Sequence, residues 1–226
     1  MLMKKFGRLA LGAAALCGAT LASAATVTLD FEGLKDGESV LGFYGGGAGS
    51  AGSVGTNYGI TFDSNTRALI DSDVPGGTGS FANEPSGSTA LFFTRGSVIL
   101  NVEQGFTDLF SFFYSTVAAT GVVRLYDGLN ATGTLIGEIS IRALGPTCVG
   151  DPTGDFCNWS LGALNFAGTA HSIDFGGIAN QIAYDNVTFG NLNIGGGPDP
   201  TPTPEPESLA LVGAALLALR LTRRRA

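Results

Sequence analysis

The sequence has little of what most catalytic and nucleic-acid-binding sites require. Its 226 residues contain one histidine, His171, one tryptophan and three cysteines, and only 14% of the residues are charged. A Ser or Cys nucleophile needs a base beside it, usually His, and the segment around His171 alternates as an exposed strand does. Only five of the twelve Lys and Arg residues lie between Ala25 and Asn193, too few for the phosphate contacts of a nucleic-acid-binding protein. The sequence therefore predicts neither catalytic residues nor a nucleic-acid partner.

The cysteines are too few for a metal site but suit one disulfide. Cys17 lies in an apolar run near the N-terminus, whereas Cys148 and Cys157 flank a short segment rich in Gly, Pro and Asp. An even pair at this spacing predicts a disulfide in an oxidising compartment. Closing so small a loop stabilises the fold by about 2–3 kcal/mol in the chain-entropy model.

The N-terminus has the layout of a secretory signal. Lys4, Lys5 and Arg8 precede an uncharged run over 9–21, and Ala22-Ser23-Ala24 supplies the small residues of a cleavage site. We expect a signal helix over 1–24 with cleavage after Ala24. The alternative, a membrane anchor, is disfavoured because the run is too short to span about 30 Å of hydrocarbon.

The C-terminus contains three different segments in succession. A Gly- and Pro-rich linker over 194–207 is followed by an apolar stretch within 208–226 and then by a cluster of arginines, Arg220, Arg223, Arg224 and Arg225. Alternating Pro favours an extended linker. The apolar stretch predicts a short transmembrane helix, and the arginines place its end in the cytoplasm by the positive-inside rule.

The order of these segments resembles a known sorting signal. Pro204-Glu205-Pro206, the following Ser208-Leu209-Ala210-Leu211, a Leu/Ala/Gly helix and the Arg cluster are similar to the PEP-CTERM signal. The resemblance implies that an exosortase, a membrane protease-transpeptidase of bacteria that make exopolysaccharide, removes the tail near Pro204 to Pro206. It further implies a transient stay in the inner membrane and release to the cell surface or matrix. Arg220 departs from the pattern by shortening the apolar run.

The body, 25–193, predicts one all-β domain. Hydrophobic alternation dominates, and no amphipathic helix of ten residues stands out. Short strands separated by Gly, Asn, Asp and Pro clusters are typical of an antiparallel β-sandwich, jelly-roll-like in topology. Gly-rich segments over 42–57 and 71–87 predict flexible surface loops. The expected strands are 26–31, 59–63, 67–70, 90–94, 97–102, 108–115, 121–126, 135–142, 159–166, 171–175 and 182–189.

Acidic residues near both ends of the body suggest a cation site. Asp30-Phe31-Glu32 lies near its start and Asp185-Asn186 near its finish, and the terminal strands of a jelly roll commonly lie side by side. The segments resemble those of secreted carbohydrate-binding jelly-roll modules, which implies a structural Ca²⁺ held by Glu32 and Asp185, with Asp30 or Asn186 as further ligands. Hard oxygen donors suit calcium. The alternative is that these acids hydrogen-bond to turns at strand ends.

Aromatic residues near the predicted loops are candidates for a sugar platform, since a pyranose has an apolar face and polar edges. They are Trp159, Tyr44, Tyr58 and Phe81, and each could instead serve packing. The predicted function is an exported surface or matrix protein, either binding exopolysaccharide in a biofilm or structural. The alternative is a secreted polysaccharide hydrolase with paired carboxylates, although no strand motif for such a pair is present.

Overall fold

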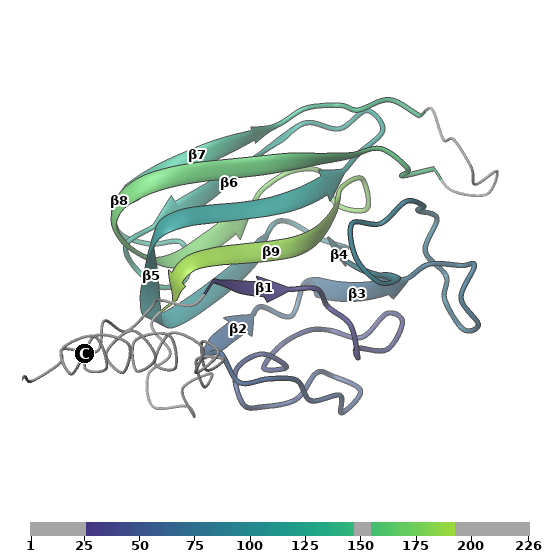
Figure 1. The fold of residues 1–226 in the computed structure, drawn as a ribbon, viewed down its shortest axis with the longest axis horizontal. Coiled ribbons are helices and arrows are strands. Elements are labelled where there is room, and N and C mark those ends of the chain that lie inside the picture. The colour runs from purple at the N-terminus through teal and green to yellow at the C-terminus, as the bar shows by residue number, and fades with distance from the viewer. Residues whose placement is uncertain (1–25, 147–154, 193–226) are drawn as a thin grey trace, which may run out of the picture.

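The computed structural model describes residues 26–146 and 155–192, which form an antiparallel all-β domain of nine strands (Figure 1). This confirms the prediction of an all-β, antiparallel fold. No helix of these residues is long and apolar enough to cross a membrane. The strands are β1 (Val27–Leu29), β2 (Ile60–Phe62), β3 (Thr66–Ile70), β4 (Thr89–Phe93), β5 (Val98–Ser115), β6 (Gly121–Tyr126), β7 (Leu135–Ile141), β8 (Trp159–Phe175) and β9 (Ala183–Leu192).

All nine strands belong to one sheet that curls into two layers. Its main order is β3-β4-β9-β5-β8-β6-β7, with β1 added to β9 and β2 added to β5. Figure 1 shows β5 and β8 bending together at one end, so that each long strand contributes to both layers. The Phe112 ring from one half of β5 packs against Phe175 at the end of β8, with ring centroids 5.8 Å apart. The two layers of this one sheet therefore enclose the core between them, with the same face of the sheet turned inward in both.

The continuity of β5 and β8 corrects the predicted strand list. We expected two strands in each region, broken near Gly105 and Gly168. Both glycines have left-handed backbones, with φ of 73° and 92°, but the register of β5 against β8 only shifts between Asn101 and Asp108. The irregularity acts as a bulge rather than a turn because the two strands bend side by side.

The core is built mainly from aromatic rings. Phe110 and Phe112 of β5 point inward, as their alternation predicts. Phe112 contacts Tyr184 with ring centroids 5.6 Å apart, and Phe175 contacts Tyr184 at 4.9 Å. Both contacts are edge-to-face, a geometry favoured by the ring quadrupoles. These rings join β5, β8 and β9 across the two layers.

A buried carboxylate orders the Gly-rich segment that we predicted as a flexible loop over 42–57. Glu38 is only 3% exposed. Its Oε1 accepts hydrogen bonds from the backbone N–H groups of Ala51 (2.8 Å) and Ser53 (3.1 Å). Its Oε2 accepts bonds from the Ser53 hydroxyl (2.6 Å) and the Lys35 N–H (2.9 Å). One side chain thus supplies four of the hydrogen bonds that fasten the segment, in addition to backbone bonds such as that from Ser50 N–H to the Ser39 carbonyl.

The terminal strands of the domain lie side by side, as predicted. β1 pairs with β9 from Val27 opposite Phe189 to Leu29 opposite Val187. On the same edge of β9, β4 pairs at Leu91 opposite Tyr184. Between Tyr184 and Val187, this edge of β9 is paired with neither β4 nor β1, and we call this stretch the β9 gap. Asp185 and Asn186 lie at this gap, and Asn186 has a φ of 49°.

Candidate ligand-binding site

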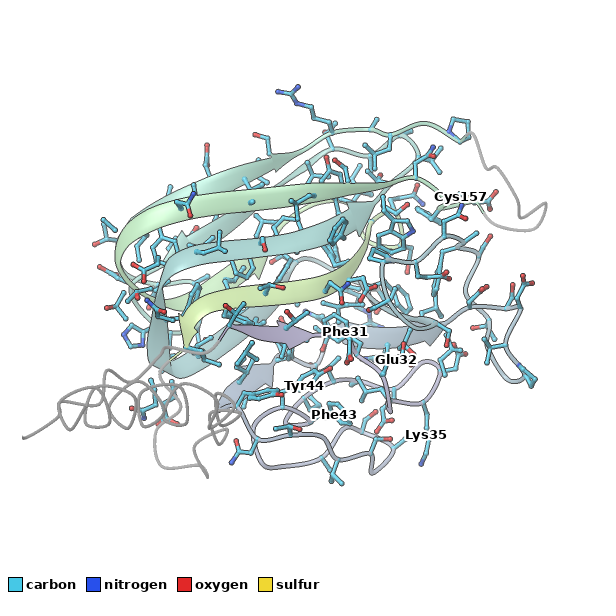
Figure 2. All side chains as sticks on the ribbon, viewed as in Figure 1. Phe31, Glu32, Lys35, Phe43, Tyr44 and Cys157 are labelled. Atoms are coloured by element: carbon cyan, nitrogen blue, oxygen red, sulfur yellow. The ribbon has the colours of Figure 1, made fainter. Side chains whose placement is uncertain are left out.

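The acidic residues from both ends of the domain hold one segment, residues 86–89. Glu32 Oε1 accepts hydrogen bonds from the N–H groups of Ser88 (2.9 Å) and Thr89 (2.8 Å). Asp185 Oδ2 accepts bonds from the Ser86 N–H (3.2 Å) and hydroxyl (3.3 Å). Figure 2 shows Glu32 just past the end of β1, which places it beside the gap in the β9 edge. Glu32 and Asp185 therefore converge, as the sequence predicted, and fasten the segment that leads into β4.

Burial gives Asp185 unusual electrostatics. Its side chain is wholly buried, and this loss of hydration raises the pKa of the carboxyl to about 7. Hydrogen bonds from Asn186 and Ser86 oppose the increase, while the nearby negative charge of Asp30 adds to it. Asp185 is thus a carboxyl group whose charge is costly at neutral pH.

The acidic residues near both ends of the domain already accept hydrogen bonds from the protein. The hydrogen bonds from 86–89 already occupy Glu32 Oε1 and Asp185 Oδ2, and Asp185 Oδ1 accepts a bond from the Asn186 N–H. Asp30 Oδ1 accepts a bond from the Glu32 N–H at 3.2 Å. Within 26–146 and 155–192, no three His, Cys, Asp or Glu residues are grouped so that they could hold a metal ion. Calcium stays a prediction, and the hydrogen-bonding alternative accounts for the contacts seen.

The predicted sugar-platform aromatics divide between two separate clusters. Tyr44 is 4% exposed and stacks on Tyr58, with ring centroids 6.3 Å apart, as part of the main core. Its hydroxyl accepts a hydrogen bond from the Phe31 N–H at 2.8 Å. Burial raises the Tyr44 pKa, and the charge of Asp30 raises it further. Tyr44 therefore has a packing environment rather than an open face.

Trp159 belongs to the second cluster, with Phe81, Ala90 and Ala183. It is half-buried, and its Nε1 donates a hydrogen bond to the Ala82 carbonyl at 3.0 Å. Figure 2 places the neighbouring Cys157 far from Tyr44. The structure thus brings Trp159 together with Phe81 but not with the two tyrosines.

Next to this second cluster the surface opens into a pocket of about 260 Å³. It lies against the outer side of β3, β4 and the start of β9, on the face turned away from the aromatic core. Five segments of the chain supply its walls, three of them between residues 69 and 92 and two from the later half of the domain. The lining residues are Leu69, Thr78, Ser80, Phe81, Phe92, Phe156, Asn180, Ile182 and Ala183.

Backbone hydrogen bonds fix the wall of the pocket. The N–H groups of Thr78 and Gly79 both donate to the Ile70 carbonyl, at 3.0 and 2.7 Å. Phe81 and Phe156 form an isolated parallel bridge. A methyl group on Gly79 would lie 2.3 Å from the Phe81 ring, so this ring can take its place only because residue 79 is glycine. The wall is therefore preformed by the chain.

Polar groups stand at the rim. The Thr78 hydroxyl donates to Asp36 Oδ2 at 2.7 Å, and the Ser80 hydroxyl donates to Asp155 Oδ2 at 3.2 Å. Asn180 is exposed with a left-handed backbone, φ 59°, and its N–H donates to the Phe93 carbonyl at 2.9 Å. In the described part of the chain its carboxamide has no hydrogen-bond partner. The rim therefore presents the NH₂ donors and the oxygen acceptor of the Asn180 carboxamide beside the carboxylates of Asp36 and Asp155.

Sequence reasoning identified Phe81 but missed most of the pocket. Phe92 was the available signal, because its neighbours Leu91 and Phe93 are fully buried and alternation therefore turns Phe92 outward. A large outward-facing aromatic residue on a strand covered by neighbours on both sides is unusual. Phe156 and Asn180 carry no comparable pattern, because each enters the pocket from a connecting segment.

Several predicted residues lie outside the described part of the chain. These are the signal peptide, Cys148, and the tail residues Pro204, Glu205, Pro206, Arg220, Arg223, Arg224 and Arg225. Cys157 is buried, and its disulfide with Cys148 stays a prediction. His171 is half-buried, with Nδ1 at 3.2 Å from the Glu103 carbonyl.

Comparison with known proteins finds only weak structural similarity. No family model and no curated protein matches the sequence. A family 6 carbohydrate-binding module from Clostridium stercorarium, solved with cellobiose, has 14% identity and a TM-score of 0.35 over 58% of this chain and 86% of that chain. The K3 cleaved adhesin domain of Lys-gingipain from Porphyromonas gingivalis has 13% identity and 0.35 over 57% and 93%.

A third structure is the family 43 arabinoxylan arabinofuranohydrolase of Bacillus subtilis, with 15% identity and a TM-score of 0.37 over 64% of this chain. The match spans 32% of that enzyme. Likeness at these TM-scores assigns neither a family nor a function to this chain.

Proposed function

We propose that this chain is an exported surface or matrix protein that binds a neutral glycan in the pocket beside β3, β4 and β9. The observation that carries the proposal is the pocket's composition, with Phe92 and Phe156 in its walls, Phe81 at its base and hydrogen-bonding groups at its rim. A sugar ring presents an apolar face to aromatic walls and hydroxyl groups to polar side chains. The pocket combines both features on preformed walls.

The charges around the rim favour a neutral ligand. Asp36 and Asp155 each bond to a rim hydroxyl, and either carboxylate would repel the carboxylate of a uronic acid. The described lining contains no Asp, Glu or His. The proposal is therefore binding, not hydrolysis, and the release of reducing sugar from matrix polysaccharide would instead support the hydrolase alternative.

A blocking variant tests whether the pocket binds glycan. Ala183→Leu extends a larger side chain from β9 into the cavity, whereas Ala163→Leu makes the same change at an exposed position of β8. On a glycan array with the purified mature protein, we expect Ala183→Leu to abolish binding and Ala163→Leu to retain it. Equal binding by both variants would refute this location, and no binding by the unmodified protein would refute the function.

The delivery step of the proposal depends on the tail. Its support is the resemblance of Pro204-Glu205-Pro206, the apolar stretch and the Arg cluster to a PEP-CTERM signal. Mass spectrometry of surface and medium fractions should find a mature chain that begins at Ala25 and ends near the Pro-Glu-Pro motif, lost when the motif is changed. An intact Arg tail retained in the membrane would make the tail an ordinary anchor.

A further inference from the structure

The floor and the rim of the pocket differ sharply in chemistry. The residues at its base are nearly inaccessible to solvent, with Phe81 2%, Ile182 1% and Ala183 6% exposed. They present only carbon atoms. The hydrogen-bonding side chains, Thr78, Ser80 and Asn180, stand at the opening, where Thr78 and Asn180 are exposed and Ser80 is half-buried. A ligand therefore meets hydrogen-bonding side chains with one edge only.

This division selects among neutral sugars. A hydroxyl group pushed onto the floor would lose its water without gaining a partner, which weakens binding by about tenfold. A methyl group placed there improves binding by about fourfold, since it leaves water for an apolar surface. An ordinary hexose carries hydroxyl groups on most of its carbons and cannot avoid the first cost if one edge is buried.

The size of the cavity limits how much ligand enters. Its volume of about 260 Å³ is at the small end for ligand pockets, which run from roughly 300 to 1,000 Å³. One sugar residue fits, and the rest of a glycan would lie outside, across the rim. The Asn180 carboxamide is placed to bond with the exposed edge of that residue.

We propose that the pocket takes a single neutral sugar residue that carries a methyl group, either an N-acetylated or a 6-deoxy sugar, with the methyl against Phe81 and Ile182. This inference rests on the proposed glycan-binding function and names the sugar class that the same site selects. The acidic rim adds the requirement that the sugar carry no negative charge. Glycans rich in acetylated or deoxy residues are then the ligands of this chain.

Pairs of sugars that differ in the methyl-bearing group test the inference. Isothermal titration of the full mature protein with L-rhamnose against L-mannose isolates the contribution of the methyl group, and N-acetylglucosamine against glucose compares a whole acetamido group with a hydroxyl group. We expect the methyl-bearing member of each pair to bind about four- to tenfold more tightly. Equal or tighter binding of mannose and glucose would overturn the inference and leave the glycan-binding function standing. No binding by any of these sugars or by any array glycan would remove both.

A single hydroxyl group added to the floor provides the internal control. Ala183→Ser gives the buried surface a hydrogen-bonding group, whereas Ala163→Ser makes the same change on the exposed face of β8. We expect the preference for the methyl-bearing sugar to fall to less than about twofold in Ala183→Ser, because a sugar hydroxyl can then find a partner. Ala163→Ser should retain the full preference, and thermal unfolding of both variants checks that they fold. An unchanged preference in Ala183→Ser would show that the methyl does not lie on this floor.

Discussion

Replacing Glu38 by Gln should loosen the whole Gly-rich segment that follows it. The glutamine has nearly the same shape, but one carboxylate oxygen becomes an NH₂ group. Each Glu38 oxygen accepts two hydrogen bonds, from Ala51 and Ser53 or from Ser53 and Lys35. If the new NH₂ group replaces Oε1, two backbone N–H donors face it; if it replaces Oε2, the Lys35 N–H faces it, while the Ser53 hydroxyl can turn and accept a hydrogen bond from it.

The size of the effect follows from these bonds. The amide should take the second orientation, which leaves one buried donor unpaired at a cost of about 1–3 kcal/mol. For a domain of this size the melting temperature should fall by about 2–12 °C.

The pH dependence gives a second readout. Burial alone would raise the Glu38 pKa, but the hydrogen bonds from Ser53, Lys35 and Ala51 outweigh it and hold the pKa below its usual value. A depressed folded-state pKa stabilises the fold at pH values above the ordinary pKa of Glu, about 4.3, and this stabilisation is lost as the pH falls through the folded-state value. The difference between wild type and Glu38→Gln should therefore shrink in acid.

Urea denaturation of both proteins at neutral and acid pH measures these changes. Glu138→Gln is the matched control, because Glu138 is exposed and makes one ion pair, 3.6 Å from Arg124. It should change stability by less than about 1 kcal/mol. The reasoning is wrong if Glu38→Gln is as stable as the control, or if its deficit does not diminish at low pH.

Three further predictions concern the β9 gap and the core. The pKa of Asp185 is raised to about 7, so the stability of the fold should decline between about pH 4 and pH 7, by at most about 4 kcal/mol. Asp185→Asn should flatten this part of a plot of melting temperature against pH. An unaltered slope would exclude Asp185 as the source of the decline. Because Glu32 already accepts two hydrogen bonds from the protein, millimolar calcium should leave the melting temperature unchanged. An increase in melting temperature with calcium that is lost in Glu32→Ala would instead support the calcium site. Gly162→Ala should destabilise by about 1–3 kcal/mol in urea, since the new methyl would lie 2.8 Å from the Phe112 ring; wild-type stability would mean that the ring moves aside freely.

The sequence was sufficient for the fold class and for the meeting of the two terminal strands. The strand β6 was predicted with its observed bounds. The bends in β5 and β8 were not predictable. Gly105 has the same conformation in a turn and in a bulge, and only the neighbouring strand, bending at the same place, decides between the two.

The pocket shows the same limit. Phe92 turns outward for a local reason, but Phe156 reaches Phe81 only through a bridge between residues far apart in the chain. The Tyr44 and Tyr58 candidates failed to join Trp159 because hydrophobic burial in the main core holds Tyr44. The order of strands in the sheet decides which loops converge, and no single segment of the sequence predicts that order.

The position of β9 determines when the domain can fold. This strand is the last of the nine, yet it lies between β5 on one edge and β1 and β4 on the other. Until a newly made chain has been extended past Leu192, β1 has no partner and the segment 86–89 lacks its contact with Asp185. Such late, long-range pairing makes folding slow and leaves strand edges and hydrophobic side chains of the incomplete chain exposed. The pairs β3–β4 and β6–β7 can form earlier, but the part of the sheet that joins β1, β4 and β5 through β9 closes only after almost all of the domain has been made.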